Sequence, residues 1–415
     1  MDSAEQPIVT AAPERRTAWI MLLALGAAFS LSQAYRTVGA MMANQLQRDF
    51  ALSAQQLGLF AGIFHFSFGG LQLVMGIGID FQGVRRTILA AFPLTIAGAL
   101  LSALAPNYAL VVLGQALIGV GCAPAFLVCT VFIAQRFPPS QFASVSGLMM
   151  GLGGLGMLLT GTPLAWIVDV SSWRTAFLVL AAGSALAWLA VFALVHEDGR
   201  SRAAQDESVL AAVRQFIALF AMPQTLGIVA LGAVTYASFI TLRGLWLGPL
   251  LIDRYGFSLL QSGNIALAVS IVSLLGPPVF GRLDPKPSKR RRWILGFTFA
   301  MAAMFALLAV THGRLAGVAA SLVIGFLTGF IVWQYADVRR AYPEALTGRA
   351  LAVFTMAMFL GIALMQWITG VVASLAHARQ ADAFTAVLLA IAAMLAAGAL
   401  GFALLPAPRP AGGRA

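Results

Sequence analysis

The chain has 415 residues, of which 60% are hydrophobic and only 10% are charged. Apolar runs of about 20 residues, the length needed to cross the hydrocarbon core of a bilayer, recur along almost the whole sequence. This pattern excludes a set of soluble domains and predicts an all-α membrane protein. The net charge of +11 does not indicate nucleic-acid binding, because the basic residues concentrate between the apolar runs.

The apolar runs divide into two groups of six, which predicts two six-helix bundles. The bundles occupy residues 17–195 and 223–405, joined by a linker at 196–222 and flanked by tails at 1–16 and 406–415. Basic residues fall mainly in the tails and in alternate connections, which the positive-inside rule assigns to the cytoplasm. We therefore expect a multi-pass protein of the cell inner (plasma) membrane with both termini cytoplasmic. The twelve predicted spans are 17–44, 53–79, 87–105, 108–135, 142–168, 173–195, 223–251, 261–281, 293–311, 315–336, 347–376 and 383–405.

The first span carries Arg36 past its midpoint, within the stretch FSLSQAYRTVG. A charge at bilayer depth is costly and seldom faces lipid, so Arg36 is predicted to face a central cavity. The alternative is that the side chain extends to the outer interface. Tyr35, its neighbour, is either a hydrogen-bonding partner for a substrate or part of the packed core. His65 is the only histidine inside a span, and it is either structural or a pH-sensitive proton carrier.

The turn after the second span reads GIGIDFQGVRR, with Gly76, Asp80, Gly83 and Arg85 at characteristic positions. This turn resembles the signature G-x-x-x-D-[RK]-x-G-[RK]-[RK] of the major facilitator superfamily. Two positions that are usually basic in this signature are not basic here, which predicts a weaker contact between the two halves on the inner side. An aspartate at a helix end pairs with a cation or with a neighbouring helix N-terminus. Asp80 and Arg85 are therefore predicted to gate the inner side of the first bundle.

The fourth and fifth spans bear on the kind of transporter that the resemblance implies. Gln115 stands where proton-coupled exporters of this family often carry an arginine, which argues against a proton/drug antiporter. The fifth span is rich in glycine and ends in Thr162-Pro163, similar to a family motif often linked to exporters. Plain close packing of helices explains the same glycines.

The linker begins with a polar run and continues with apolar residues at helical spacing between positions 209 and 220. This spacing predicts a short amphipathic helix lying on the inner membrane surface.

The seventh span repeats the feature of the first. It carries Arg243, with Tyr236 and Trp246 nearby, and Arg243 precedes Phe257 by the same fourteen residues that separate Arg36 from Phe50. We interpret the two spans as equivalent first helices of two repeats, each directing one cation toward a shared cavity. Tyr236 is either a substrate partner or core, and Trp246 either packs or stacks on a substrate.

Two later spans complete the predicted site and gate. Asp337, close to Arg340, lies near the inner end of the tenth span and is expected to form the gate of the second bundle. Gln366 lies past the midpoint of the eleventh span and, with Gln115, is a candidate pore-lining residue.

The resemblance to the major facilitator superfamily extends over essentially the whole chain. It implies two six-helix bundles that rock around a central site. Organic-anion and organophosphate carriers of the superfamily place arginines on the first and seventh helices, as Arg36 and Arg243 are placed here. Two guanidiniums facing one cavity suit a planar anion, which accepts paired hydrogen bonds from each fork.

The function predicted from the sequence is secondary transport of a small organic anion, a carboxylate or phosphate ester, by alternating access. The alternative is an exporter of drugs or of other neutral or cationic solutes; a sensor on the same fold is a weaker rival. The sequence shows no metal cluster, cofactor site or catalytic set, so no enzyme is predicted, and a monomer in the bilayer is expected. Proton symport through His65, anion exchange and facilitated diffusion all remain open. The predicted substrate-binding residues are Arg36, Arg243, Tyr35, Tyr236, Gln115, Gln366 and Trp246.

Overall fold

The computed structural model describes residues 12–196, 214, 218–283 and 285–406. The predicted tails, and most of the linker with its amphipathic helix, lie outside these residues. Within the described residues, eleven helices are long and apolar enough to cross a membrane. The remaining span of the predicted twelve is helix α3 (Ala54–Gly70), which is 17 residues long and continues past Leu71 into α4 (Gln72–Leu104).

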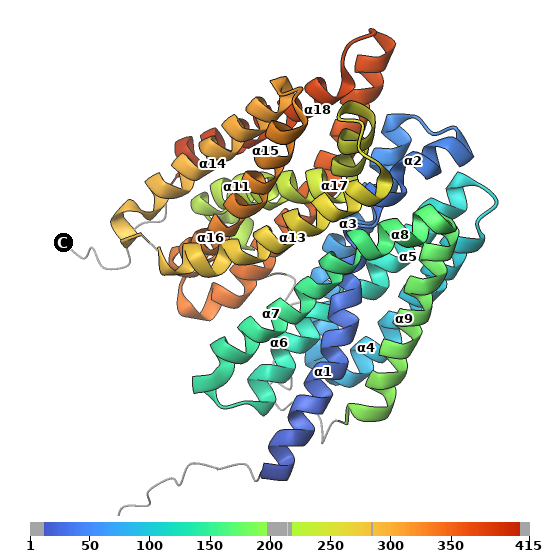
Figure 1. Ribbon diagram of the computed structural model, residues 1–415. Helices are drawn as coiled ribbons and strands as arrows, with labels where there is room; N and C mark the ends of the chain where they lie inside the picture. Colours follow the sequence, from blue (N-terminus) through green and yellow to red (C-terminus); the bar gives the residue numbers. More distant parts are fainter. Residues whose placement is uncertain (1–11, 197–213, 215–217, 284, 407–415) are drawn as a thin grey trace, which may run out of the picture.

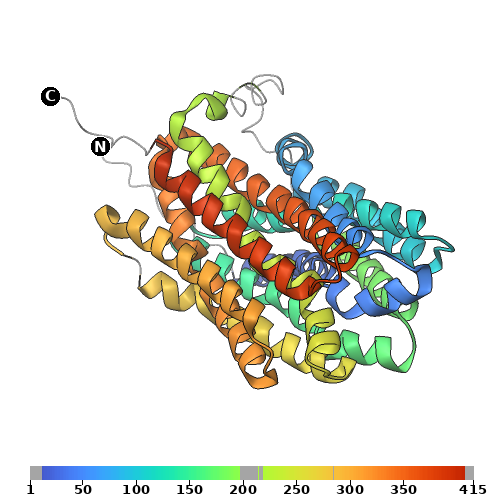
Figure 2. The ribbon, with the colours of Figure 1, turned by 90° about the horizontal axis from the view of Figure 1, so that it is seen from above.

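The helices form two groups that lie side by side (Figures 1 and 2). The first group runs from α1 to α9 and the second from α11 to α18, which confirms the prediction of an all-helical membrane fold with two bundles. Besides α3 and α4, the first group contains α1 (Ala12–Tyr35), α2 (Gly39–Phe50), α5 (Tyr108–Cys122), α6 (Ala125–Arg136), α7 (Phe142–Leu159), α8 (Thr162–Val170) and α9 (Trp173–Leu194). The second contains α11 (Pro223–Thr241), α12 (Leu247–Pro249), α13 (Leu259–Arg282), α14 (Pro287–Val310), α15 (Arg314–Leu327), α16 (Ile331–Ala341), α17 (Glu344–Ala378) and α18 (Ala383–Leu404).

Several spans that the sequence predicts as continuous helices are interrupted. The first span breaks between Tyr35 and Gly39, so that Arg36 lies in the break itself. The seventh span widens into a π-helical segment, Leu242–Trp246, which contains Arg243. Such π-helical turns occur frequently at functional sites. The two arginines therefore sit at the irregular points of equivalent spans.

The second span of each group begins with the same capping arrangement. In α3 the Ser53 hydroxyl accepts from the Gln56 backbone N–H, and the Gln56 side chain accepts from Ser53. Ser258 and Gln261 make the reciprocal pair at the start of α13. Both boxes satisfy backbone donors that a helix start leaves without partners. This shared local chemistry supports the interpretation of two sequence repeats.

The two groups touch along one end of the molecule, where α3 packs on α17 and α8 packs on α13. We call this the outer end, because it holds the turns predicted to lie outside the cell. Glycine permits the approach: a Cβ atom at Gly62 would lie 2.9 Å from the carbonyl oxygen of Ala363 in α17. At the opposite end, the starts of α1 and α14 point in different directions (Figure 1). The structure is therefore closed at its outer end.

A polar cluster at the outer end joins three helices of the second group. Nη2 of Arg254, which ends the seventh span, lies 2.7 Å from Oδ2 of Asp382. The same nitrogen donates to the carbonyl of Ala309 in α14 and to the hydroxyl of Thr385 in α18. Asp382 also caps α18 by accepting from the Phe384 backbone N–H. One ion pair thus fixes the outer ends of three helices relative to each other.

Replacing Asp382 with alanine should lower the free energy of unfolding by about 1 kcal/mol, the usual value of a lost helix cap. Asp382→Asn should cost less, because an amide oxygen still caps α18. Burial alone raises the pKa of this carboxyl, but the Thr385 hydroxyl and the Arg254 guanidinium outweigh it and hold the pKa below its ordinary value of 3.8. A depressed pKa means that the contribution is complete above the ordinary value and disappears as pH falls through the folded-state value. Melting curves in detergent should therefore separate wild type from both variants at pH 7. In acid the difference from Asp382→Asn should disappear, while Asp382→Ala, which has no capping oxygen, stays less stable.

Candidate functional site

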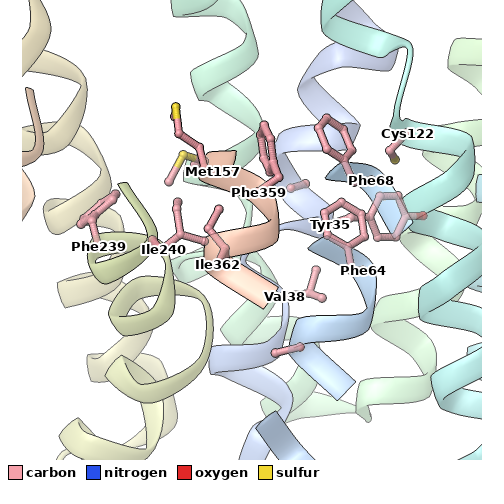
Figure 3. Packing of buried hydrophobic residues seen from close by; sticks show 14 of the residues in the cluster. Tyr35, Val38, Phe64, Phe68, Cys122, Met157, Phe239, Ile240, Phe359 and Ile362 are labelled. Atoms are coloured by element: carbon pink, nitrogen blue, oxygen red, sulfur yellow. The ribbon is translucent and has the colours of Figure 1, made fainter. Parts of the chain in front are cut away.

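Arg36 lies against a pair of adjacent aromatic rings, one from each bundle. Its Cζ atom lies 4.7 Å from the ring centroid of Phe68 in α3 and 4.6 Å from that of Phe359 in α17. The two rings are themselves 4.4 Å apart, centroid to centroid, and lie next to each other in Figure 3. The Arg36 side chain is only 7% exposed, and its Nε has no hydrogen-bond partner. Aromatic faces attract a cation without neutralising its charge.

Polar groups from both bundles surround this guanidinium. The phenols of Tyr236 and Tyr335 lie within electrostatic reach of it. His65 is stacked on Phe359 and hydrogen-bonds the Ala61 carbonyl through Nδ1. Gln366 lies beside His65, but neither its amide nor His65 Nε2 reaches hydrogen-bond geometry. The site thus combines one positive charge with several polar groups that remain available.

Several buried polar side-chain atoms among the described residues have no hydrogen-bond partner. Buried polar groups are nearly always hydrogen-bonded, so each exception is a donor or acceptor that water or a ligand can use. The exceptions on the predicted spans come from both bundles. They include Ser32 Oγ, Gln33 Oε1, Arg36 Nε, His65 Nε2, Gln115 Nε2, Thr241 Oγ1, Arg243 Nη1, Gln334 Nε2 and both amide atoms of Gln366.

Arg243 is fully buried, and most of its guanidinium nitrogens have hydrogen-bond partners. Its Nε donates to the Ala266 carbonyl and to the Ser270 hydroxyl in α13, at 3.2 and 2.9 Å. Its Nη2 donates across to the first bundle, to the Met157 carbonyl at 3.1 Å and to Thr160 Oγ1 at 3.4 Å. Only Nη1 lacks a partner. This arginine therefore joins the two bundles in the closed outer contact.

The two arginines are connected through a pair of threonines. Thr37, next to Arg36, shares a 2.6 Å hydrogen bond with Thr160, the residue that accepts from Arg243. The sequence predicts two guanidiniums that share one cavity. The structure brings them into one region, but each has its own contacts: Arg36 lies against the adjacent rings of Phe68 and Phe359, and Arg243 lies against α7.

The other predicted substrate ligands are divided between the centre and the bundle interiors. Gln115 and Gln366 are buried with unpartnered amide atoms, and Tyr236 approaches Arg36. Tyr35 instead shares a hydrogen bond with Ser184 in α9, inside the first bundle. Trp246 donates through Nε1 to Thr369 in α17, within the second bundle.

The predicted gating residues lie at the inner end. The Asp80 side chain is outside the described residues. Arg85 donates to the carbonyls of Phe192 and Val195 at the end of α9, within its own bundle. Asp337 lies within electrostatic reach of the exposed Arg340, and of Arg290 and Arg291 in α14.

Sequence reasoning missed the aromatic pair and Thr160. The sequence does contain a pattern that could have identified the two rings. Phe68 follows His65 by three residues, and Phe359 precedes Gln366 by seven. Both spacings place the ring on the same helix face as the polar residue. In the described part of the chain, no group of three or more His, Cys, Asp or Glu side chains is arranged to hold a metal ion.

Comparison with known proteins agrees with this architecture. The sequence model of the Major Facilitator Superfamily matches residues 23–364. The chain belongs to this superfamily. It is 25% identical over 309 residues to a hexuronate transporter of Bacillus subtilis, an alignment that covers 69% of the chain and 72% of the relative.

Solved transporters of this superfamily share the fold. A bacterial homologue of the human lysosomal transporter Spinster, in an inward-facing and occupied conformation, superposes with a TM-score of 0.76 and 15% identity over 95% of this chain and 97% of its own. A D-xylose-proton symporter gives a TM-score of 0.75 at 15% identity over 94% and 98% of the two chains. These findings confirm the predicted family and fold, and they identify the chain as a multi-pass membrane transporter of a small-molecule substrate rather than an enzyme.

Proposed function

We propose that this protein moves a small organic anion across the cell inner membrane by alternating access, with Arg36 as its principal ligand. The observation that carries the proposal is a buried guanidinium whose neighbours are aromatic rings and neutral polar groups. None of the described carboxylates forms an ion pair with Arg36 or Arg243. Asp49 accepts from Trp173 Nε1, and Asp253 accepts from Asn44. A buried charge needs a partner, and here the anionic substrate supplies it.

The guanidinium suits a carboxylate or a phosphate ester better than a compact ammonium does. Its planar fork donates two parallel hydrogen bonds to one planar anionic group. Phe68 and Phe359 lie next to each other on one side of it, and its Nε, which has no partner, is a donor left for a ligand. Arg243 Nη1, which has no partner, is a second donor for the same anion.

The polar groups around Arg36 favour an anion whose carbon skeleton carries hydroxyl groups. Gln366 and His65 offer unpartnered donors and acceptors of the kind that bind hydroxyls. The similarity to a hexuronate transporter supports this choice, since a hexuronate is a sugar with a carboxylate. We further propose that the bundles at 17–195 and 223–405 act as a monomer with both termini cytoplasmic. Asp80, Arg85, Asp337 and Arg340 are proposed to line the inner gate.

The alternative is an exporter of neutral or cationic solutes. Such a substrate would give the positive charge of Arg36 no anionic partner. Cation binding prefers a negative site, whereas the charged group at this centre is positive. Coupling has three candidate modes: proton symport through His65, anion exchange and facilitated diffusion. His65 Nε2 is unpartnered beside Gln366, which makes it the candidate proton site for the first mode.

Purified protein should be stabilised by glucuronate and not by glucose or glucosamine, which replace the carboxylate with a neutral or a cationic group. A ligand that binds only the folded state at 100 times its Kd adds about 2.7 kcal/mol to stability. Melting temperature against ligand concentration measures this effect, and a wider set of sugar acids and phosphate esters covers other anions. Equal stabilisation by glucosamine and glucuronate would refute the anion assignment.

A further inference from the structure

Arg243 is a buried charged side chain whose hydrogen bonds cross the closed outer contact. It belongs to the second bundle, yet its Nη2 donates to Met157 and Thr160 of the first. Both acceptors lie at the end of α7, which stops at Leu159 before the chain resumes as α8. The last carbonyls of a helix lack intrahelical donors and carry partial negative charge. A guanidinium from the opposite bundle therefore caps the C-terminus of α7.

The side chain is held in the orientation that this cap requires. Ser270 and the Ala266 carbonyl, both on α13, fix Nε. The π-helical segment displaces the backbone at Arg243, and Gly244 beside it approaches the Arg36 carbonyl so closely that a Cβ there would lie 2.8 Å from the oxygen. Arg243 thus has two sets of contacts. The bonds to Ser270 and Ala266 stay within its own bundle, and the bonds to Met157 and Thr160 join it to the other bundle.

Other hydrogen bonds across the outer contact are more exposed to water. Asn44 donates to Asp253, Thr162 donates to Asn264 at 2.6 Å, and the Gln55 backbone N–H donates to Ser374, all at exposed positions. Water competes for these exposed groups, including the charge-assisted bond to the Asp253 carboxylate, whereas the bonds of the buried cation are shielded from water. Among these cross-bundle bonds, those of Arg243 should contribute most to holding the outer end shut.

We propose that Arg243 is a positioning residue that latches the outer gate, by capping α7 when the outer end closes and releasing it when the end opens. The latch rests on alternating access, which the superfamily shares, and not on the identity of the substrate. On opening, the Ser270 and Ala266 bonds stay within the second bundle while the Met157 and Thr160 bonds break. Nη2 is then free, so Arg243 offers a complete donor edge to an anion only in the outward-open state.

The latch is tested by measuring the outer gate directly, without substrate. Spin labels at Pro106→Cys and Ala381→Cys mark exposed outer turns of opposite bundles, in a background where the buried Cys122 and Cys129 are replaced by serine. Wild type should give mainly one short distance. Arg243→Gln should raise the ratio of long to short distances at least tenfold, and Arg243→Lys by a smaller factor, since an ammonium can still cap α7.

Two controls distinguish a latch from simple packing. Ser270→Ala removes a bond within the second bundle and should leave the distance ratio within about twofold of wild type. Thr160→Val removes an acceptor across the gate and should shift the distance ratio toward the open state. Thr160→Ser keeps the hydroxyl and should not shift it. If Arg243→Gln does not fold, this pair of variants tests the latch in its place. An unchanged ratio in a folded Arg243→Gln protein, or an equal shift in Ser270→Ala, would overturn the latch. Because no ligand is present, either result is independent of whether the substrate is an anion.

Discussion

Replacing Arg36 with glutamine should reduce transport of the anionic substrate at least 100-fold while the protein stays folded. A hydrogen bond to a charged group contributes about 1.5–3 kcal/mol, so the loss of a bidentate pair exceeds the 2.7 kcal/mol that corresponds to 100-fold. Glutamine keeps polarity and much of the length, and it removes a buried charge that has no ion-pair partner among the described residues. Initial uptake rates in proteoliposomes measure the effect.

Two further substitutions control for charge and for general damage. Arg36→Lys keeps the charge but loses the planar fork and the stacking on Phe68 and Phe359, so it should recover only a small part of the activity. Arg379→Gln removes an exposed arginine from an outer turn and should leave transport close to wild type. Wild-type rates in Arg36→Gln would rule out the anion site and leave a transporter of unassigned substrate class.

The sequence predicts the fold and the two arginines, but not the local backbone at either of them. A charged residue within an apolar run can be recognised from the sequence alone. Such a charge is costly in the bilayer, so its presence indicates a functional position. The break at Arg36 carries no proline and no turn signal before Gly39. It depends on contacts from distant segments, such as the bond between Thr37 and Thr160 and the close approach of Gly39 to the Gly244 carbonyl.

The direction of a side chain is a second limit of the sequence. Tyr35 adjoins Arg36 in the chain, yet neighbours on a helix point about 100° apart, and Tyr35 reaches Ser184 instead of the centre. Tyr236 precedes Arg243 by seven residues, a spacing that keeps two residues on one face, and it lies beside the guanidinium of Arg36. Its partner comes from the other bundle, and no pattern within one span identifies that partner.

Introducing valine at Gly58 should prevent the outer end from closing and reduce transport at least tenfold. A Cβ atom there would overlap the Gln366 carbonyl oxygen and lie 3.1 Å from the Gly370 Cα, both on α17. These are backbone atoms of the opposite bundle, so no side-chain rearrangement relieves the overlap, and small residues are what allow such helices to approach. In the open state the same valine meets no such obstacle, so the protein should remain folded.

A matched substitution on the same helix separates this steric effect from the change of residue type. A Cβ atom at Gly70 would have nothing within 4 Å, and Gly70→Val should therefore transport close to the wild-type rate. Labels on the outer turns should report a shift toward long distances in Gly58→Val and none in Gly70→Val. If both variants lose transport equally, α3 is sensitive to any β-branched residue and the contact with α17 is not the cause. If Gly58→Val transports normally, the closed outer end seen here is not an obligatory state of the cycle.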